Sequence, residues 1–252
     1  MAVALSTLVE EADRYLASAK IADYCPNGLQ VEGRPQVMRI VSGVTASQAL
    51  LDAAVEAGAD LVLVHHGYFW KGENPCVTGM KQRRLKTLLK HDISLLAYHL
   101  PLDLHPDVGN NVQLARQLDI TVEGPLDPDN LKIVGLVGSL KEPLTARDFA
   151  RKVQEVMGRE PLLIEGNPMI RRVGWCTGGG QGYIDQAVAA GVDLYLSGEA
   201  SEQTFHSARE NDISFIAAGH HATERYGVQA LGDYLAKRFA VEHIFIDCPN
   251  PI

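Results

Sequence analysis

The sequence predicts an α/β fold made of two similar α/β domains that arose by internal duplication. Short apolar runs alternate with helical patterns along almost the whole 252-residue chain. Residues 52–66 and 185–199 align without gaps at 8 identities in 15, where unrelated segments of average composition would share about one. A second pair, Asp92–Ser94 and Asp212–Ser214, follows in the same order, and each opens an apolar strand. Two separate segments that agree in order favour a repeat.

Helices and strands are expected to alternate from the N-terminus. Thr7 and Glu10 predict a capping box for an opening helix, and 23–28 has the composition of a turn. The strands expected in the first half are 40–44, 61–64 and 94–100, and the helices are 47–57, 80–89 and 111–118. The strands expected in the second half are 133–137, 162–164, 172–176, 194–196, 213–217 and 243–246, and the helices are 145–157, 183–190, 202–209 and 223–239. The Pro- and Asp-rich segment 125–129 suggests a boundary, giving a first domain of residues 1–124 completed by 223–252, and a second of 125–222.

Composition excludes several classes of protein. The net charge of −8 comes without a basic stripe, so direct nucleic-acid binding is not expected. The four cysteines contain no CxxC pair, which disfavours a thiolate zinc site and a secreted disulfide framework. No basic leader and no run of 18 apolar residues are present, so we expect a cytoplasmic protein without a membrane segment.

Ligand-type side chains follow four of the expected strands. In open α/β sheets, ligands bind beyond the carboxyl ends of the strands. The residues at these ends are His65, His66, His99, Asp103, Glu199, His220 and Glu224. In both halves a histidine stands four residues before a carboxylate, as His99 before Asp103 and as His220 before Glu224.

Imidazole and carboxylate together suit zinc, iron, manganese or nickel. His65 and His66 serve one ion only if the chain turns at Gly67; otherwise each binds a different ion of a two-metal centre. His220 and Glu224 share a face if they are helical, although this spacing is not that of a zincin. Because these residues converge on one edge of the fold, the sequence predicts a metal site.

Three further features have two readings each. The segment 178–180 is either a phosphate-binding loop or a tight strand–helix turn. Lys81, Arg83 and Arg84 form either a phosphate-binding cluster or a solvated helix face. The aromatic run 68–70 either lines a pocket or packs in the core or at a subunit contact.

The chain resembles the GTP cyclohydrolase 1 type 2 homologues, related to the Ngg-interacting-factor-three proteins, and specifically their bacterial YbgI-like branch. The segments that carry the resemblance are 23–33, 43–47, 65–67, 99–103, 109–111, 177–180, 197–199 and 219–224. The resemblance extends from about Ile21 to Pro251, nearly the whole chain.

This resemblance implies two similar domains facing a cleft, a homohexameric ring and a dinuclear centre of two divalent metal ions per subunit. The ligands that it implies are His65, His66, Asp103, His220 and Glu224. His99, Glu199 and His206 match positions lining that centre, and Thr177 lies in a matching segment as a further lining residue. His221 stands where many relatives carry tyrosine, and it is left out of the ligand set.

The preferred hypothesis is a metal-dependent hydrolase that opens the ring of a nucleotide or related heterocycle with a metal-activated hydroxide. His99 or Glu199 is the expected general acid/base. The alternatives are a non-enzymatic metal-binding ring scaffold or metal chaperone, and a metallophosphoesterase or peptidase. The fold alone does not choose among them.

Overall fold

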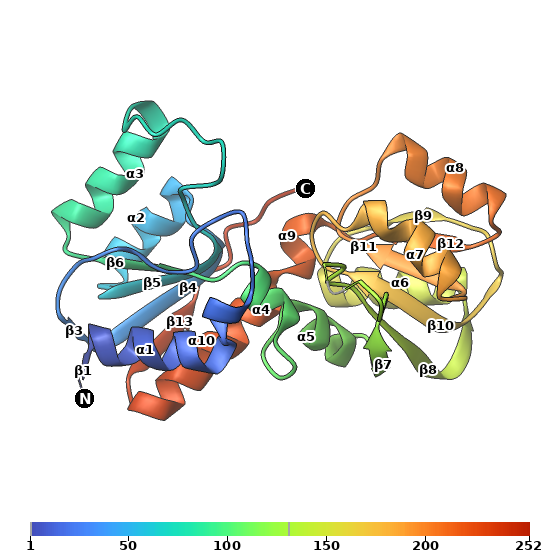
Figure 1. The fold of residues 1–252 in the computed structure, drawn as a ribbon, viewed down its shortest axis with the longest axis horizontal. Coiled ribbons are helices and arrows are strands. Elements are labelled where there is room, and N and C mark those ends of the chain that lie inside the picture. The colour runs from blue at the N-terminus through green and yellow to red at the C-terminus, as the bar shows by residue number, and fades with distance from the viewer. Residues whose placement is uncertain (1, 131) are drawn as a thin grey trace. The chain divides into compact units, whose positions relative to one another are not determined.

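The structure, a computed structural model, describes residues 2–130 and 132–252, and it confirms the α/β class with two separate mixed sheets (Figure 1). The chain forms two compact units. The first unit combines the chain up to Gly109 with Gly227–Cys248, and the second comprises Asn110–Tyr226 and Pro249–Ile252. These divisions differ from the expected ones at residues 124 and 222. The reason is that β7 (Ile120–Pro125) pairs with β8 (Leu136–Thr145) in the sheet of the second unit.

The first unit contains a five-stranded sheet in the order β13-β4-β5-β6-β2. Its strands are β13 (Glu242–Phe245), β4 (Arg39–Thr45), β5 (Leu61–His66), β6 (Ser94–Ala97) and β2 (Gly28–Val31). The first four strands run parallel, and β2 closes the edge antiparallel to β6. A separate antiparallel pair joins β1 (Val3–Ala4) to β3 (Gln36–Val37).

Helices cover both faces of this sheet, as the alternation of side chains along a strand requires. Leu61 and Leu63 pack with α1 (Leu5–Leu16) and α10 (Arg225–Phe239). Val62 and Val64 pack on the other face with α2 (Gln48–Glu56) and α3 (Gly79–Lys90) (Figure 1). The remaining helical segments of this unit are η1 (Ser18–Lys20) and α4 (Leu100–Leu104).

The start of α1 differs from the expected one. The helix begins at Leu5 behind Ala4, which gives no side-chain cap, so the prediction of a capping box at Thr7 and Glu10 is wrong. Leu5 is buried, and its amide donates to the carbonyl of Pro35 at 2.9 Å. Tertiary contacts therefore start the helix earlier than the capping residues suggest.

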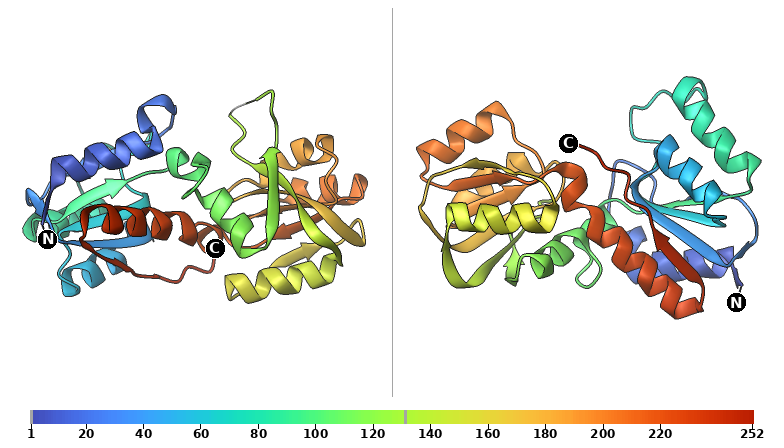
Figure 2. Two further views of the ribbon diagram at one scale, coloured as in Figure 1. Left: turned by 90° about the horizontal axis from the view of Figure 1, so that it is seen from below. Right: turned by 180° about the vertical axis from the view of Figure 1, so that it is seen from behind.

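The second unit contains a six-stranded sheet in the order β7-β8-β10-β11-β12-β9. Its other strands are β10 (Met169–Cys176), β11 (Leu194–Ser197), β12 (Ser214–Ala217) and β9 (Leu162–Ile164). Trp175 and Leu196 pack with α5 (Asn110–Gln117) and α6 (Ala146–Met157) on one face. Tyr195 and Phe215 pack with α7 (Ile184–Ala189) and α8 (Glu202–Glu210) on the other (Figure 2). The remaining helical segments are η2 (Gln181–Tyr183) and α9 (His220–Thr223).

The two sheets share a four-strand pattern. In both β4-β5-β6-β2 and β10-β11-β12-β9, three parallel strands are followed by one antiparallel strand. A carboxylate braces each pattern at the same place, because Asp60 accepts from the amides of Met38 and Arg39 as Asp193 accepts from those of Arg171 and Arg172. Among the described residues, no helix is both long and apolar enough to span a membrane.

Candidate functional site

Two adjacent histidines end β5 in the first unit. His65 is fully buried, and its Nδ1 lies 2.9 Å from the carbonyl oxygen of Tyr98. Nδ1 can donate to that carbonyl, and Nε2 faces Asp103, whose Oδ1 is 3.5 Å away. The Nδ1 of His66 lies 3.1 Å from the hydroxyl of Thr45 on β4. Each imidazole is thus held in place by its neighbours on the sheet.

His99 and Asp103 come from the turn after β6. The strand ends at Ala97, three residues earlier than expected, so His99 caps α4 and Asp103 lies one turn further on. The amide of Asp103 donates to the His99 carbonyl at 3.2 Å. Both side chains are buried, at 7% exposure each. His99 and Asp103 are therefore one helical turn apart and joined by this backbone hydrogen bond.

The loop 23–28 holds the His99 ring. His99 Nδ1 lies 3.0 Å from Asp23 Oδ1, and the His99 amide donates to Asn27 Oδ1 at 2.7 Å. Burial opposes ionisation of Asp23, but hydrogen bonds from His99, Asn27 and the Leu100 amide lower the pKa of Asp23 well below its usual range. Asp23 is therefore a permanent carboxylate that orients His99.

The three imidazoles form one group. His65, His66 and His99 each offer a nitrogen, and these nitrogens lie within 4.8 Å of one another. Trp70 covers the group, with its ring centre 5.1 Å from His99 and 6.0 Å from His66. Cys25 lies close by in a group with Asp23 and His99. Burial, and then the charges of Asp23 and Asp103, raise the pKa of the Cys25 thiol to about 12, so it stays protonated at neutral pH.

The second unit contains a histidine between two carboxylates. His220 Nδ1 lies 2.6 Å from Glu199 Oε1, and His220 Nε2 lies 3.2 Å from Glu224 Oε2. Burial disfavours the charged ring, but Glu224 and then Glu199 raise the pKa of His220 to about 9. Glu224 is buried at 4% exposure, whereas Glu199 stays partly accessible. The residues that the sequence placed four apart are therefore in direct contact.

The glycine-rich segment 178–180 packs against this pair. Gly178 has a φ of +64°, and a Cβ there would overlap Oε1 of Glu224 and lie 3.1 Å from His220 Nε2. Its amide donates to Thr223 Oγ1 at 3.0 Å, so this amide is engaged within the protein. Of the two readings, the structure favours the tight strand–helix turn, which makes room for Glu224.

The other expected site residues lie in different surroundings. Thr177 is buried beside Gly178; its amide donates to Asn111, and its hydroxyl has no hydrogen-bond partner among the described residues. His206 lies on α8 with a side chain 60% exposed, 3.7 Å from Glu202. The His221 side chain is buried, and its amide donates to the Ile252 carbonyl at 3.1 Å.

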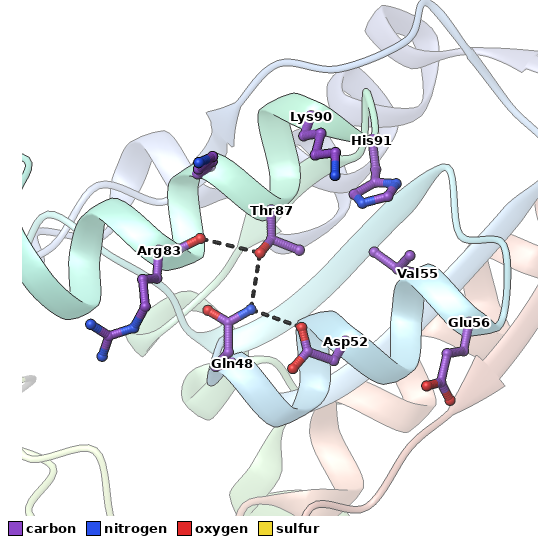
Figure 3. A pocket seen from close by; sticks show the side chains of 9 residues that line it. Gln48, Asp52, Val55, Glu56, Arg83, Thr87, Lys90 and His91 are labelled. Carbon is purple, nitrogen blue, oxygen red and sulfur yellow. Dashed lines mark hydrogen bonds between the residues drawn. The ribbon is translucent and has the colours of Figure 1, made fainter.

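The basic residues of α3 lie elsewhere in the first unit. Lys81 pairs with Glu73 at 3.0 Å. Arg83 borders a groove of about 490 Å³ between α2 and α3, where Gln48 bridges Asp52 and Thr87 (Figure 3). Because the groove at Arg83 has both acidic and basic walls, it does not favour a phosphate site there.

The donor chemistry in each unit fits a metal. Nitrogen and carboxylate donors without an ionised thiolate suit first-row divalent ions. In each unit one ring nitrogen of a histidine faces a carboxylate, and the other ring nitrogen is held by a hydrogen bond. The Nδ1 of His65 is held by the Tyr98 carbonyl, and the Nδ1 of His220 is held by Glu199. Such outer hydrogen bonds fix ligand histidines in metal sites. The buried His, Asp and Glu groups are therefore compatible with metal binding.

Sequence reasoning missed the residues that support the histidines. Asp23 and Asn27 were read only as turn chemistry, although short polar side chains in turns often bind nearby backbone and rings. The aromatic run 68–70 divides: Trp70 lines the histidine group, while Tyr68 is buried in the core and donates to the Ala46 carbonyl. Neither role has a clear signal in spacing alone.

Comparisons with known proteins give the relatives of this chain and the structures it is similar to. A GTP cyclohydrolase 1 type 2 homolog of Pseudomonas aeruginosa is 80% identical over 251 residues and covers all of both chains. The solved structure of protein YbgI, of unknown function, has a TM-score of 0.95 at 52% identity and covers 99% of this chain and 100% of its own. The protein TTHA1606 from Thermus thermophilus has a TM-score of 0.91 at 33% identity, with the same coverage.

A family profile, Duf34/NIF3 (NGG1p interacting factor 3), matches residues 3–251. The suspected resemblance is thereby confirmed, and the chain belongs to the Duf34/NIF3 family and is a GTP cyclohydrolase 1 type 2 homologue.

Proposed function

We propose that this protein is a metal-dependent hydrolase acting on a nucleotide or related heterocycle. The observation that carries the proposal is the histidine group of the first unit. His65 presents a nitrogen beside the carboxylate of Asp103. His66 and His99 present nitrogens within 4.8 Å of a ring nitrogen of His65, and His99 is held by a hydrogen bond of its own to Asp23. A purely structural cluster would not need three imidazoles, two buried and one half-buried, that are each held by a separate hydrogen-bond partner.

The proposed ligands are His65, His66 and Asp103 in the first unit and His220 and Glu224 in the second, and the proposed metals are two divalent ions per subunit, of iron, zinc, manganese or nickel. The donor types support this set. So do the supports described above, because Tyr98, Thr45 and Glu199 each fix one of the histidines. His206 and Thr177 are proposed only to line the site.

His99 is the proposed proton-transfer group. Its Nδ1 is held by the Asp23 carboxylate, and its Nε2 lies 3.5 Å from the hydroxyl of Tyr24. Glu199, the other expected acid/base, is engaged by His220 at 2.6 Å, and we assign it the orientation of that ring.

In the proposed reaction water adds to an electron-poor ring carbon and one ring carbon–nitrogen bond breaks. Bound divalent ions supply Lewis acidity, which lowers the pKa of water toward about 7. His99 takes the proton of the attacking water and returns it to the leaving nitrogen. Trp70 and Tyr24, with ring centres 5.7 Å apart, supply flat surfaces for a heterocycle beside His99.

The substrate class is supported by the curated relatives, which are called GTP cyclohydrolase 1 type 2 homologs. We also propose a homohexamer. Its support is a group of exposed apolar side chains in and before α3, with Val77, Met80 and Leu89 each more than half exposed. Light scattering at micromolar concentration should give a species of about six subunits, and a single 27.4 kDa species would contradict it.

The decisive experiment is metal content per subunit of protein purified without a His-tag, followed by turnover of a nucleotide panel on the same sample. We expect two divalent ions and hydrolytic ring opening of a purine nucleotide. Metal binding without turnover of nucleotides, phosphoesters or peptides would replace the hydrolase by a metal-binding scaffold. Turnover of phosphoesters or peptides alone would change the reaction class.

A further inference from the structure

A second pocket lies in the second unit beside Glu199. It has a volume of about 570 Å³, and its walls include Arg159, Leu162, Gly198, Glu199, Gly219 and Pro251. Glu199 contacts the Nδ1 of His220, and Gly219 directly precedes His220 in the chain. The pocket therefore borders the residues that we assign to the reaction.

Arg159 is placed in this pocket by the end of α6. The helix stops at Met157, Gly158 adopts a left-handed φ of +71°, and Arg159 follows at once. Its guanidinium lies against the backbone of Gly219, where a Cβ would meet Nη1 and would lie 3.0 Å from Cζ. Gly219 itself has a φ of +102°, which favours glycine. The chain thus leaves room for the guanidinium at this point.

Arg159 forms no ion pair with any of the described residues. The Nη1 of Arg159 is buried and has no hydrogen-bond partner among the described residues. Two acidic side chains, Glu160 and Glu199, share the pocket wall, and Glu199 is paired with His220 at 2.6 Å. By contrast, Arg151 on α6 pairs with Asp148 at 2.8 Å. A guanidinium keeps its charge at all accessible pH values, so the pocket offers a cation whose Nη1 is free to bind an anion.

We propose that Arg159 binds the anionic group of the substrate, a phosphate, and so holds the molecule with its reacting end toward His220 and Glu199. The planar guanidinium suits bidentate contacts with phosphate. A chain of net charge −8, with Glu199 and Glu224 at the site, needs a local cation to accept an anionic substrate. The inference rests on the proposed function, which supplies the nucleotide.

The test is calorimetric binding of inorganic pyrophosphate to the metal-loaded, full-length protein. We compare wild type with Arg159→Gln and with Arg151→Gln, the matched control of equal charge change. Charge-assisted contacts of this kind predict that Arg159→Gln binds pyrophosphate about 10- to 100-fold more weakly, whereas Arg151→Gln binds like wild type. Metal content should be unchanged in both variants.

Equal affinity in wild type and Arg159→Gln, or no binding to wild type, would overturn the assignment. So would loss of metal in Arg159→Gln, because the weaker binding would then come from the metals. Should Arg159→Gln fail to fold, Arg159→Lys keeps the charge without the planar fork, and an affinity equal to wild type would remove the bidentate contact. If pyrophosphate binding depends on Arg159 but nucleotides are not turned over, the phosphate subsite is supported and the proposed hydrolase function is contradicted. If nucleotides are turned over but pyrophosphate binding does not depend on Arg159, the hydrolase function is supported and the phosphate subsite is contradicted.

Discussion

The two units share a scaffold but carry different chemistry at the ends of equivalent strands. Aligning 52–66 with 185–199 matches His65 and His66 with Gly198 and Glu199. Aligning Asp92 with Asp212, both at a φ of +52°, matches His99 with Gly219 and Asp103 with Thr223. The two pairs of histidine and carboxylate are therefore one residue out of register. The repeat accounts for the matching strands and for the equivalent carboxylates Asp60 and Asp193. It does not account for the positions of the candidate metal ligands.

The support of the histidines differs as well. In the first unit a neutral carbonyl, that of Tyr98, holds His65. In the second a carboxylate, Glu199, holds His220, and together with Glu224 it keeps that ring charged when no metal is bound. In the metal-free protein His220 must therefore give up a proton before it can bind an ion.

The largest expected effect is on metal content. His65→Ala and Glu224→Ala remove one proposed ligand from each unit, and each should lower metal per subunit sharply in a folded protein. His91→Ala, in the groove of Figure 3, is the control and should keep the wild-type amount. Elemental analysis measures the result. A wild-type amount of metal in either ligand variant would remove that residue from the ligand set.

The next effect concerns His99. If this ring transfers protons, His99→Asn should keep both metals and lose about 10²- to 10⁴-fold in turnover. If the ring only orients Asp103, the loss should be about 10- to 100-fold. Metal content and turnover on one sample separate these outcomes. Loss of metal would make His99 a ligand, as its place among the three imidazoles also permits.

The shared bracing carboxylates should give similar effects on stability. Asp60→Ala and Asp193→Ala each leave two backbone amides without their acceptor, at a cost of about 1–3 kcal/mol in the free energy of unfolding. Asp60→Ala should cost more, because Asp60 is 3% exposed and also pairs with Arg34 at 2.8 Å. Urea unfolding measures both. If one of the two variants had the stability of wild type, the carboxylate at that position would not stabilise its unit, although Asp60 and Asp193 accept equivalent hydrogen bonds.

The smallest effect is a pH dependence from the second unit. The folded pKa of His220, about 9, lies above the value of about 6.5 for an unfolded histidine. The stabilisation is therefore fully present below about pH 6.5 and is lost as the pH rises through about 9. In metal-free protein the melting temperature of wild type should fall more between pH 6 and pH 10 than that of His220→Gln. Parallel curves for the two proteins would contradict the charged pair.

Local patterns predicted the α/β class, the buried strands and the ligand-type residues at strand ends, because each depends on periodicity or on a strand's end. Local patterns could not predict the residues that hold the histidines in place. Asp23 meets His99 across 76 positions of the chain, and nothing in either segment encodes that pairing. The early start of α1 and the inclusion of β7 in the second sheet likewise depend on tertiary contacts, which override local capping and turn signals. His206 matches a family motif, yet its exposed position on α8 could not be inferred from the residue alone.

The order of the chain through the two units has a consequence for folding. The second unit is made almost entirely from one continuous stretch, whereas the first needs β13 to pair with β4 about 200 residues earlier in the sequence. Closing so long a loop is entropically costly and slow. During synthesis the inner stretch can collapse first, while β4 waits as an open strand edge and α1 lacks the apolar surface of α10. Removing the chain from Gly227 onward should therefore undo the unit that contains its beginning.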